Sequence, residues 1–357
     1  MELANIKTKY FCAIDLHNKN MYVCIMEKDG KILYHKKLIN NFEIFLKELE
    51  KYKKEMSVGV ESTHNYYWLF DNCLKASIPF YLGHAFYLRA IRGKKNKNDK
   101  KDSKTLGDLM RSEFFPIGYP YPAKRRAVRD LLRRRCKFVQ QRAGLYRHID
   151  LIHSQQGLIN IKTGEIKSKS QRRELQKNFS DEEIKLSIET DLNIVDALDK
   201  EINTMEKRIR KVVKTKEEEY FKILLSFPGI GEIIALTIIY EIDKIDRFIT
   251  PQKFSSYSRV VKPQRESSGK KTDDKNKKIG NPYLKWSFGQ ASLYARIKSL
   301  TIRRFYENLV KTNGKTKANS IMRHKVAVSV YYMLRNKELF NEQKFLQGNM
   351  NSQRPIK

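Results

Sequence analysis

The sequence has few cysteines, a shortage of acidic residues and no long apolar run. Only four of its 357 residues are cysteine, and no two of them form a C-x-x-C pair. This usage argues against both a disulfide framework and a zinc site. No segment reaches the roughly 18–20 apolar residues that a membrane-spanning helix needs, and the first residues lack a signal-peptide pattern. We expect a soluble cytoplasmic protein whose thiols are reduced and buried.

The shortage of acidic residues leaves a large positive charge. The chain has 72 lysines and arginines against 40 aspartates and glutamates, which gives a formal net charge of +32. Polyanions are the natural partners of such a chain. An anionic membrane surface is the competing partner, but without an apolar anchor we favour nucleic acid. The length leaves room for two domains.

The N-terminal third alternates between short apolar strands and amphipathic helices. Turn signals separate the first three strands, and Lys28–Gly30 is typical of a hairpin. Strands are expected at residues 10–16, 21–27, 32–38, 57–61 and 79–82, and helices at residues 41–54, at residues 66–76 and from Asp99 onward. Three antiparallel strands followed by alternating helix and strand is the order of an α/β ribonuclease-H-like domain.

Four carboxylates stand out in this region. Asp15 lies in the middle of an apolar strand, where an unpaired charge is costly, and Glu61 ends the fourth strand. Asp99 and Asp102 fall on one face of the first turn of a helix that Asn98 is suited to cap. If the four converge, they can hold one or two Mg²⁺ or Mn²⁺ ions for phosphoryl transfer. The simpler alternative is a set of solvated carboxylates at strand and helix ends.

Basic residues surround and follow this acidic helix start. Lys97 belongs to the run Gly93–Lys104, whose lysines suit a phosphate backbone. The helix predicted at residues 125–155 carries Arg129 and Arg133 among several other arginines. Phosphate binding and simple solvation both fit that helix, and the net charge favours phosphate binding.

A polar, lysine-rich segment at residues 157–179 separates that helix from a second long one. From Ile184 to Ile209 apolar residues recur every three or four positions, which is typical of a coiled-coil seam. We expect a helical arm that pairs either within the chain or between protomers.

A mostly helical C-terminal unit is expected to begin near Tyr220. Its first landmark, Phe227–Ala235, reads F-P-G-I-G-E-I-I-A. Pro-Gly-x-Gly before an apolar helix is typical of a helix-hairpin-helix element, in which Gly229 and Gly231 would bring backbone N–H groups to a DNA phosphate.

Two adjacent serines lie in a basic loop of the same unit. Ser267 and Ser268 precede Gly269, Lys270 and Lys271. Such hydroxyls can cap a helix or contact a phosphate. Alternatively, one of them can attack a DNA phosphorus while the cations offset the developing charge.

These segments predict four parts. They are a catalytic α/β domain at residues 8–115, a helical coiled-coil region at residues 116–215, a serine-containing domain at residues 220–340 and a disordered tail at residues 341–357.

Several strings of this sequence occur in the same order in a known family. They are A-I-D-L-H, V-E-S-T, L-G-H-A-F-Y, K-N-D-K-K-D-S, R-D-L-L-R-R-R, F-P-G-I-G, S-S-G-K-K and K-K-I-G-N-P-Y-L-K-W. On these strings the chain resembles the DEDD-type transposases of bacterial and archaeal insertion sequences. In that family a Holliday-junction-resolvase-like (RuvC-like) domain precedes a serine-dependent transposase domain.

The resemblance implies specific roles. Asp15, Glu61, Asp99 and Asp102 would be the DEDD ligands of Mg²⁺ or Mn²⁺, and a serine would form a covalent phosphoserine link to DNA. The family's S-[G/A]-G-K loop aligns its serine with Ser267, and here Ser268 takes the place of Gly or Ala.

The resemblance also implies partners. These are donor and target DNA, a structured non-coding guide RNA, and further copies of the chain in a dimer or tetramer with a composite site. The corresponding location is the cytoplasm of a prokaryote, in association with the nucleoid.

Two other functions stay open on the sequence. A junction-resolving nuclease of the same fold would use metal-activated water and leave the serine idle. The other is a catalytically inert protein, such as a decayed transposase, that binds nucleic acid through its positive charge. The four carboxylates and the serine loop are intact, which argues against a loss of activity.

Overall fold

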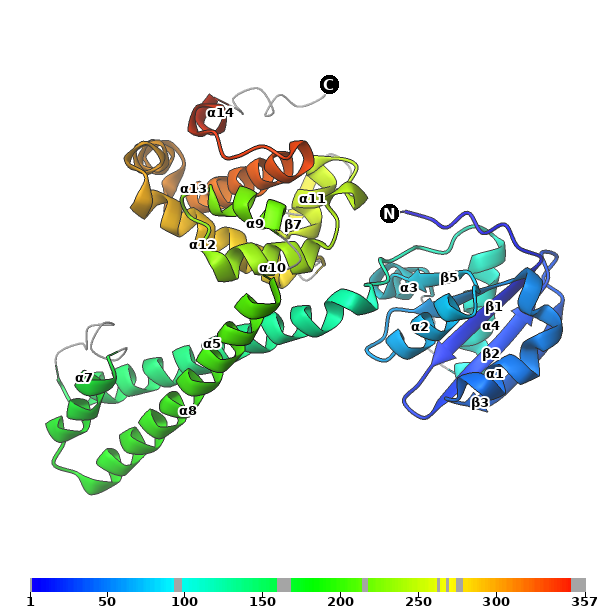
Figure 1. Cartoon of the computed structure of the whole chain (residues 1–357), viewed down its shortest axis with the longest axis horizontal. Helices are drawn as coiled ribbons and strands as arrows, with labels where there is room; N and C mark the ends of the chain where they lie inside the picture. The colour runs from blue at the N-terminus through cyan, green and yellow to red at the C-terminus, as the bar shows by residue number, and fades with distance from the viewer. Residues whose placement is uncertain are drawn as a thin grey trace. The chain divides into compact units, whose positions relative to one another are not determined.

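The computed structural model describes residues 2–92, 98–158, 168–213, 218–261, 264–267, 270–273 and 279–347. The chain divides into two compact units, Met1–Lys124 and Arg125–Lys357. The first is built on a β-sheet and the second almost wholly on helices (Figure 1).

A five-stranded mixed sheet forms the centre of the N-terminal unit. Its strands are β1 (Tyr10–Leu16), β2 (Asn20–Met26), β3 (Ile32–Ile39), β4 (Met56–Glu61) and β5 (Phe80–Gly83), in the order β3-β2-β1-β4-β5. The first three strands are antiparallel, and β4 and β5 run parallel to β1. The predicted strands are confirmed, and the mixed sheet fits a ribonuclease-H-like domain.

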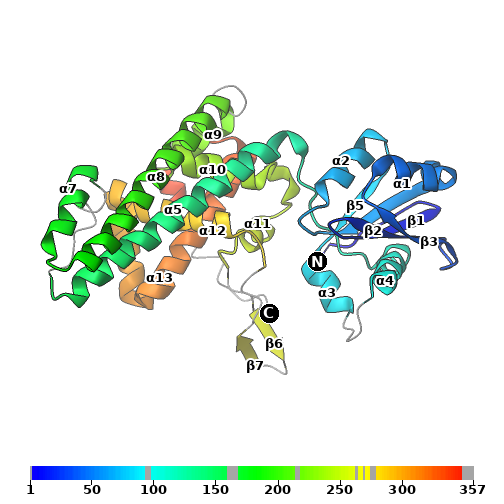
Figure 2. The same ribbon diagram turned by 90° about the horizontal axis from the view of Figure 1, so that it is seen from below.

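Helices cover both faces of this sheet (Figure 2). They are α1 (Phe42–Leu49), the 3₁₀ helix Glu50–Glu55, α2 (Tyr67–Lys75), α3 (Ala85–Arg92) and α4 (Asp99–Arg111). Cys12 and Ile14 of β1 lie in the core on the α1 and α2 side, while Phe11 and Ala13 pack with Leu106 of α4. Side chains alternate along a strand, so Asp15 belongs to the face that α4 covers.

Helix α4 approaches the sheet closely. Gly107 lies against β1 and β2, where an added Cβ would be 2.7 Å from the Met26 methyl group. Ser103, which is buried, is 3.0 Å from Nε2 of His35 on β3. Burial lowers the pKa of His35, which favours the neutral ring. As predicted, Asn98 caps the helix by accepting a hydrogen bond from the Lys100 amide.

Two long helices form an arm in the second unit. They are α5 (Ala123–Gln155) and α8 (Glu182–Val213), joined through α7 (Lys169–Glu174) and the 3₁₀ helix Leu175–Asn178. Ion pairs link the two helices at Arg135–Glu206, Arg142–Asp199 and His148–Asp191. Along α5 the paired residues have rising numbers, and their partners on α8 have falling numbers. The two helices are therefore antiparallel and pair within the chain. A coiled-coil register and pairing between protomers stay predictions.

The rest of this unit is a helical bundle with a small hairpin. The helices are α9 (Glu218–Leu225), α10 (Glu232–Ile242), the 3₁₀ helix Ile245–Arg247, α11 (Pro251–Tyr257), α12 (Pro282–Lys298), α13 (Leu300–Asn336) and α14 (Glu342–Gln347). Helix α10 is the centre of the bundle, because every residue from Ile234 to Ile242 is buried. Among the described residues, no helix is both long and apolar enough to cross a membrane.

Two features differ from the sequence expectations. The serine-containing segment, expected as a loop, includes the antiparallel strands β6 (Gln264–Ser267) and β7 (Lys270–Asp273). The expected disordered tail begins with α14, which is ordered because Phe345 packs into the bundle core and is only 4% exposed. Residues 348–357 lie outside the described residues.

The Pro-Gly-x-Gly turn between α9 and α10 contains two glycines with different surroundings. An added Cβ at Gly229 would lie 1.9 Å from the carbonyl oxygen of Ala291 in α12. An added Cβ at Gly231, the N-cap of α10, would meet no atom within 4 Å. Gly229 therefore allows α12 to pack against the turn, whereas Gly231 leaves the start of α10 open. The helix-hairpin-helix assignment stays a prediction.

Gly229→Ala should lower the free energy of unfolding by about 3 kcal/mol, at the upper end of overpacking effects, because the clash is with backbone. Gly231→Ala is the matched control and should cost less than about 1 kcal/mol, since the new methyl group meets no neighbour. Urea unfolding of the two variants measures the difference. Equal losses would show that the close packing at Gly229 is not required.

Candidate active site

Two of the four predicted carboxylates meet at the N-terminal end of α4. Asp15 from β1, Asp99 from α4 and His17, just beyond β1, place one ligand atom each within 4.8 Å of one another. Nε2 of His17 lies 3.2 Å from Oδ2 of Asp15 and 3.4 Å from Oδ1 of Asp99. The side chain of Asp15 is 15% exposed, whereas those of Asp99 and His17 are half exposed. The cluster therefore opens to solvent on one side.

The backbone around His17 is held in place by two amide side chains. Nδ2 of Asn40 and Nδ2 of Asn65 each donate a hydrogen bond of 2.8 Å to the His17 carbonyl oxygen. Asn40 follows β3 and Asn65 lies after β4, so segments from both sides of β1 in the sheet fix the backbone at its end. The backbone of His17 is therefore positioned by the protein itself, without help from a ligand.

Glu61 and Asp102 lie beside this cluster, but neither is part of the three-residue group. The β1–β4 pairing ends at Ile14 and Val60, so Asp15 and Glu61 follow at the next position of the two parallel strands. Asp102 stands one turn after Asp99 in α4 and is partly buried. Negative charge is favoured at this end of a helix by the helix dipole. The full set of four ligands stays a prediction.

The donor chemistry of the cluster fits a divalent cation. Carboxylate oxygens are the preferred ligands of Mg²⁺, and a neutral imidazole suits Mn²⁺ as well. The partly buried Asp15 and the solvent-exposed Asp99 leave room for water ligands, which Mg²⁺ retains. Sequence reasoning missed His17, although the D-x-H spacing at a strand end was the available signal.

The serine hairpin is the second candidate element. Ser267 pairs with Lys270 in the last register position of β6 and β7. Ser268 and Lys97 lie outside the described residues. Lys270 and Lys271 are the first two residues of β7. Figure 2 shows the hairpin projecting from the bundle next to α11.

The base of the hairpin is closed by one side-chain and one backbone hydrogen bond between its two ends. Nε of Arg259 donates to the Ile279 carbonyl oxygen at 2.9 Å, and the Asn281 amide donates to the Tyr257 carbonyl oxygen at 2.6 Å. Gly280 has a φ of +91°, a conformation that favours glycine. An added Cβ there would come within 2.5 Å of the Tyr257 carbonyl oxygen. The two ends of the serine segment are therefore held together at a fixed position in the bundle.

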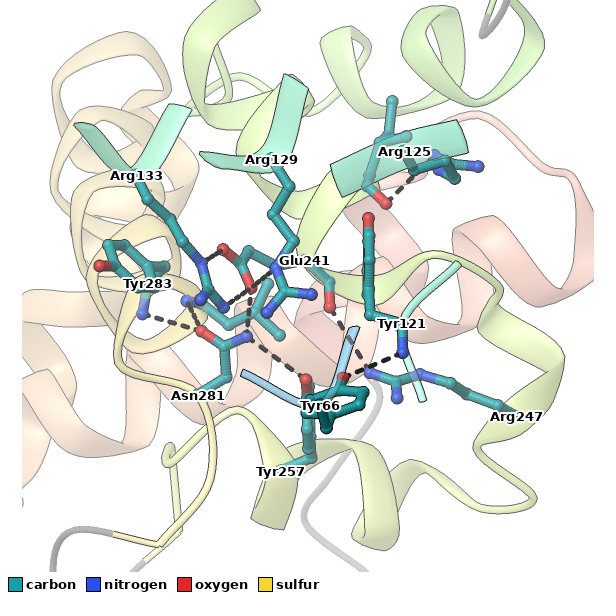
Figure 3. Close-up of polar contacts among 12 residues, drawn as sticks. Tyr66, Tyr121, Arg125, Arg129, Arg133, Glu241, Arg247, Tyr257, Asn281 and Tyr283 are labelled. Carbon is teal, nitrogen blue, oxygen red and sulfur yellow. Dashed lines mark hydrogen bonds and ion pairs between the residues drawn. The ribbon is translucent and has the colours of Figure 1, made fainter. Parts of the chain in front are cut away.

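Asn281 connects this base to a buried carboxylate (Figure 3). Its Oδ1 caps α12 by accepting from the Tyr283 and Leu284 amides, and its Nδ2 donates to Oε2 of Glu241 at 2.7 Å. Glu241 lies near the end of α10, and its side chain is only 2% exposed. Arg133 of α5 meets this carboxylate with two hydrogen bonds of 2.6 and 2.8 Å.

The charge of Glu241 is therefore shared among several elements. Nε of Arg129 lies 3.5 Å from Oε2 of Glu241, and the Arg133 guanidinium stacks on the Tyr283 ring at 4.7 Å. Burial alone would lower the pKa of Arg133, but the hydrogen bonds and charge of Glu241 outweigh it and raise that pKa above its ordinary value. Helices α5, α10 and α12 meet at this ion pair.

Arg129 and Arg133 thus have a structural partner that the sequence did not reveal. Their side chains are 13% and 30% exposed, and both face a buried glutamate. Phosphate binding by these two arginines and by the glycine turn stays a prediction.

Two comparisons with family models match this chain. A model described as a DEDD transposase of the IS110 type matches residues 12–152. A second model, described as the transposase IS116/IS110/IS902 family, matches residues 221–307. The first match includes Asp15, Glu61, Asp99 and Asp102, and the second includes the serine hairpin. The comparison with curated proteins found no match.

Glu241→Gln should lower the free energy of unfolding by about 3–5 kcal/mol, because it removes the charge that two partly buried arginines face. Thermal or urea unfolding followed by circular dichroism measures the loss. The matched control is Glu232→Gln on the same helix, whose ion pair with Arg210 is about half exposed. It should cost less than about 1 kcal/mol. A loss no greater for Glu241 than for Glu232 would contradict a structural role for the buried pair.

Proposed function

The chain belongs to the IS110 family of DEDD transposases, and we propose that it moves its insertion sequence by metal-assisted, serine-dependent DNA strand exchange. DNA is therefore its substrate. The first unit would contribute the metal-binding carboxylates to the reaction, and the second unit would contribute the serine. The observation that supports the metal-dependent part is the meeting of Asp15 and Asp99, from a strand and a helix 84 residues apart in the sequence, within ligand distance of each other.

The carboxylates would hold the ion from a rigid platform. Asp15 is fixed by its pairing with Tyr22 of β2, directly after the last β1–β4 pair, and Asp99 by the capped start of α4. Glu61 and Asp102 would complete the set, with His17 orienting the two central carboxylates. A bound Mg²⁺ or Mn²⁺ would supply Lewis-acid stabilisation of phosphate oxygens.

The serine would act as the nucleophile of the exchange. Ser267 Oγ loses its proton, forms a bond to a DNA phosphorus, and the bond from that phosphorus to a sugar oxygen breaks. The departing sugar oxygen takes up a proton. In the second half of the exchange, a sugar hydroxyl of the other DNA loses its proton and attacks the phosphorus of the phosphoserine. The bond from phosphorus to Oγ then breaks, and the serine takes a proton back. Lys270 and Lys271, next to the serine in sequence, would offset the charge that develops on the phosphate.

A guide RNA and self-association complete the proposal. The net charge of +32 suits RNA as well as DNA, because lysines and arginines neutralise the phosphates of either polymer. The guide would pair with donor and target DNA, and a dimer or tetramer would hold both DNA molecules.

Asp15→Asn and Asp99→Asn should each reduce DNA cleavage and strand exchange by at least about 100-fold, because each removes a metal-binding charge. They should also weaken Mn²⁺ binding measured by calorimetry, with DNA binding retained. Glu43→Gln, an exposed carboxylate of α1, should change neither quantity. Undiminished Mn²⁺ binding and activity in both aspartate variants would refute the metal site.

Ser267→Ala should abolish the covalent protein–DNA adduct on a nicked suicide substrate, while Ser268→Ala should retain it. Denaturing gel electrophoresis of labelled DNA measures the adduct. The opposite result would assign the nucleophile to Ser268. Cleavage by the wild-type protein without any adduct would instead indicate a junction-resolving nuclease that uses water.

A further inference from the structure

A groove on the C-terminal bundle combines an aromatic ring with fixed cations. It lies between α12 and the second half of α13 and has a volume of about 410 Å³, within the range of ~300–1,000 Å³ usual for ligand pockets. Its chemically informative lining residues are Lys285, Trp286, Gln290, Arg296, Asn319 and Arg323.

Of the described residues that line the groove, three are basic and none is acidic. Glu307 is the only acidic residue between Asp274 and Glu338 in the sequence, and it does not line the groove. Within the described part of the chain, Nε of Arg323 is buried and has no hydrogen-bond partner. A buried guanidinium N–H without an acceptor is costly, and the same guanidinium belongs to the groove lining, where its other N–H groups can donate to a phosphate oxygen.

A second arginine forms a rigid wall of the groove. Nη1 of Arg296 donates to Oδ1 of Asn319 at 3.1 Å, and the guanidinium stacks 3.9 Å from the centre of the Tyr306 ring. Oη of Tyr306 donates to the same Asn319 oxygen at 3.0 Å. This arrangement fixes the position of the cation in the groove wall.

Trp286 supplies the aromatic face. It is partly buried against the bundle core, and it also lines the groove. A base that remains in a duplex is stacked between its neighbours, so only an unpaired base can reach a ring at this depth. Gln290, one helical turn further along α12, offers an amide to the edge of such a base.

We propose that this groove binds one unpaired nucleotide of a DNA or RNA strand, with the base against Trp286 and its phosphate on Lys285 and Arg323. Pro282, the first lining residue of the groove in the sequence, directly follows Asn281, which closes the serine hairpin. An unpaired nucleotide held here would keep the strand in an opened conformation beside that hairpin. The binding itself does not require the serine to react.

Intrinsic fluorescence tests the proposal, because Trp68 and Trp286 are the two tryptophans of the chain. In the full chain with Trp68→Phe and without divalent metal, oligothymidylate or oligouridylate should quench the Trp286 emission, and a duplex of equal length should not. The two single strands show whether DNA, RNA or both are accepted. Equal quenching by the duplex, or no quenching by either single strand, would overturn the proposal.

Two substitutions separate the base contact from the phosphate contact. Trp286→Ala should weaken single-strand binding by about 5- to 150-fold, as expected for the loss of base stacking, and Trp286→Phe should retain most of it. Arg323→Gln should reduce the slope of log affinity against log salt by about 0.7.

Matched controls come from exposed residues of the same unit. Tyr332→Ala, on α13, should leave single-strand affinity unchanged, and Arg208→Gln, on α8, should leave the quenching unchanged. The groove variants should keep the circular dichroism spectrum of the parent. Losses as large in the controls as in the groove variants would show general charge binding and refute the site. Since no bond is broken in this assay, a negative result would leave the serine proposal intact.

Discussion

The C-terminal unit depends on one interaction, the ion pair between the buried carboxylate of Glu241 and Arg133. Glu241 lies in an apolar helix, with its side chain 2% exposed, and it meets Arg133 from α5 and Asn281 from the start of α12. A charge in such a place is tolerated only when its partners are positioned well, because desolvation otherwise exceeds the Coulombic gain. The ion pair thus fixes the relative placement of three helices more than it adds net stability. Since Asn281 also closes the serine hairpin, the same contact sets where that hairpin begins.

In the N-terminal unit, small residues rather than an ion pair set the position of a helix that contributes to the candidate site. Gly59 and Gly107 let α4 lie close to the strands, so that an added Cβ at Gly59 would come within 2.3 Å of the Met110 sulfur. This close approach brings the first turn of α4 to the end of β1, where Asp99 meets Asp15 and His17. The carboxylate cluster is therefore a result of backbone packing well away from the cluster itself.

Much of this arrangement could be predicted from local patterns. The strands of the sheet follow from apolar runs bounded by turn signals, and the start of α4 follows from the capping ability of Asn98. Asp15 stood out because a charge in an apolar strand needs a reason. Helix α3 was missed because a Gly-His sequence before it is not a usual cap, and the β6–β7 hairpin because its residues are polar and lack strand alternation. The partnership of Arg133 and Glu241 was beyond reach, because 108 residues separate them and neither spacing nor composition encodes tertiary contacts.

The arm has a consequence for the scale of any assembly. Helix α5 has 33 residues, which corresponds to about 50 Å at 1.5 Å per residue. B-form DNA rises 3.4 Å per base pair, so this length equals about 15 base pairs, or roughly one and a half turns of the double helix. Polar contacts at Arg135, Arg142 and His148 hold the paired helices together over about 20 Å of that length. Because Arg129 and Arg133 lie in the bundle, the part of α5 that pairs with α8 runs from Arg135 to Gln155. This part is about 30 Å long, equal to roughly nine base pairs, and it sets the distance between the bundle and anything bound at the tip of the arm.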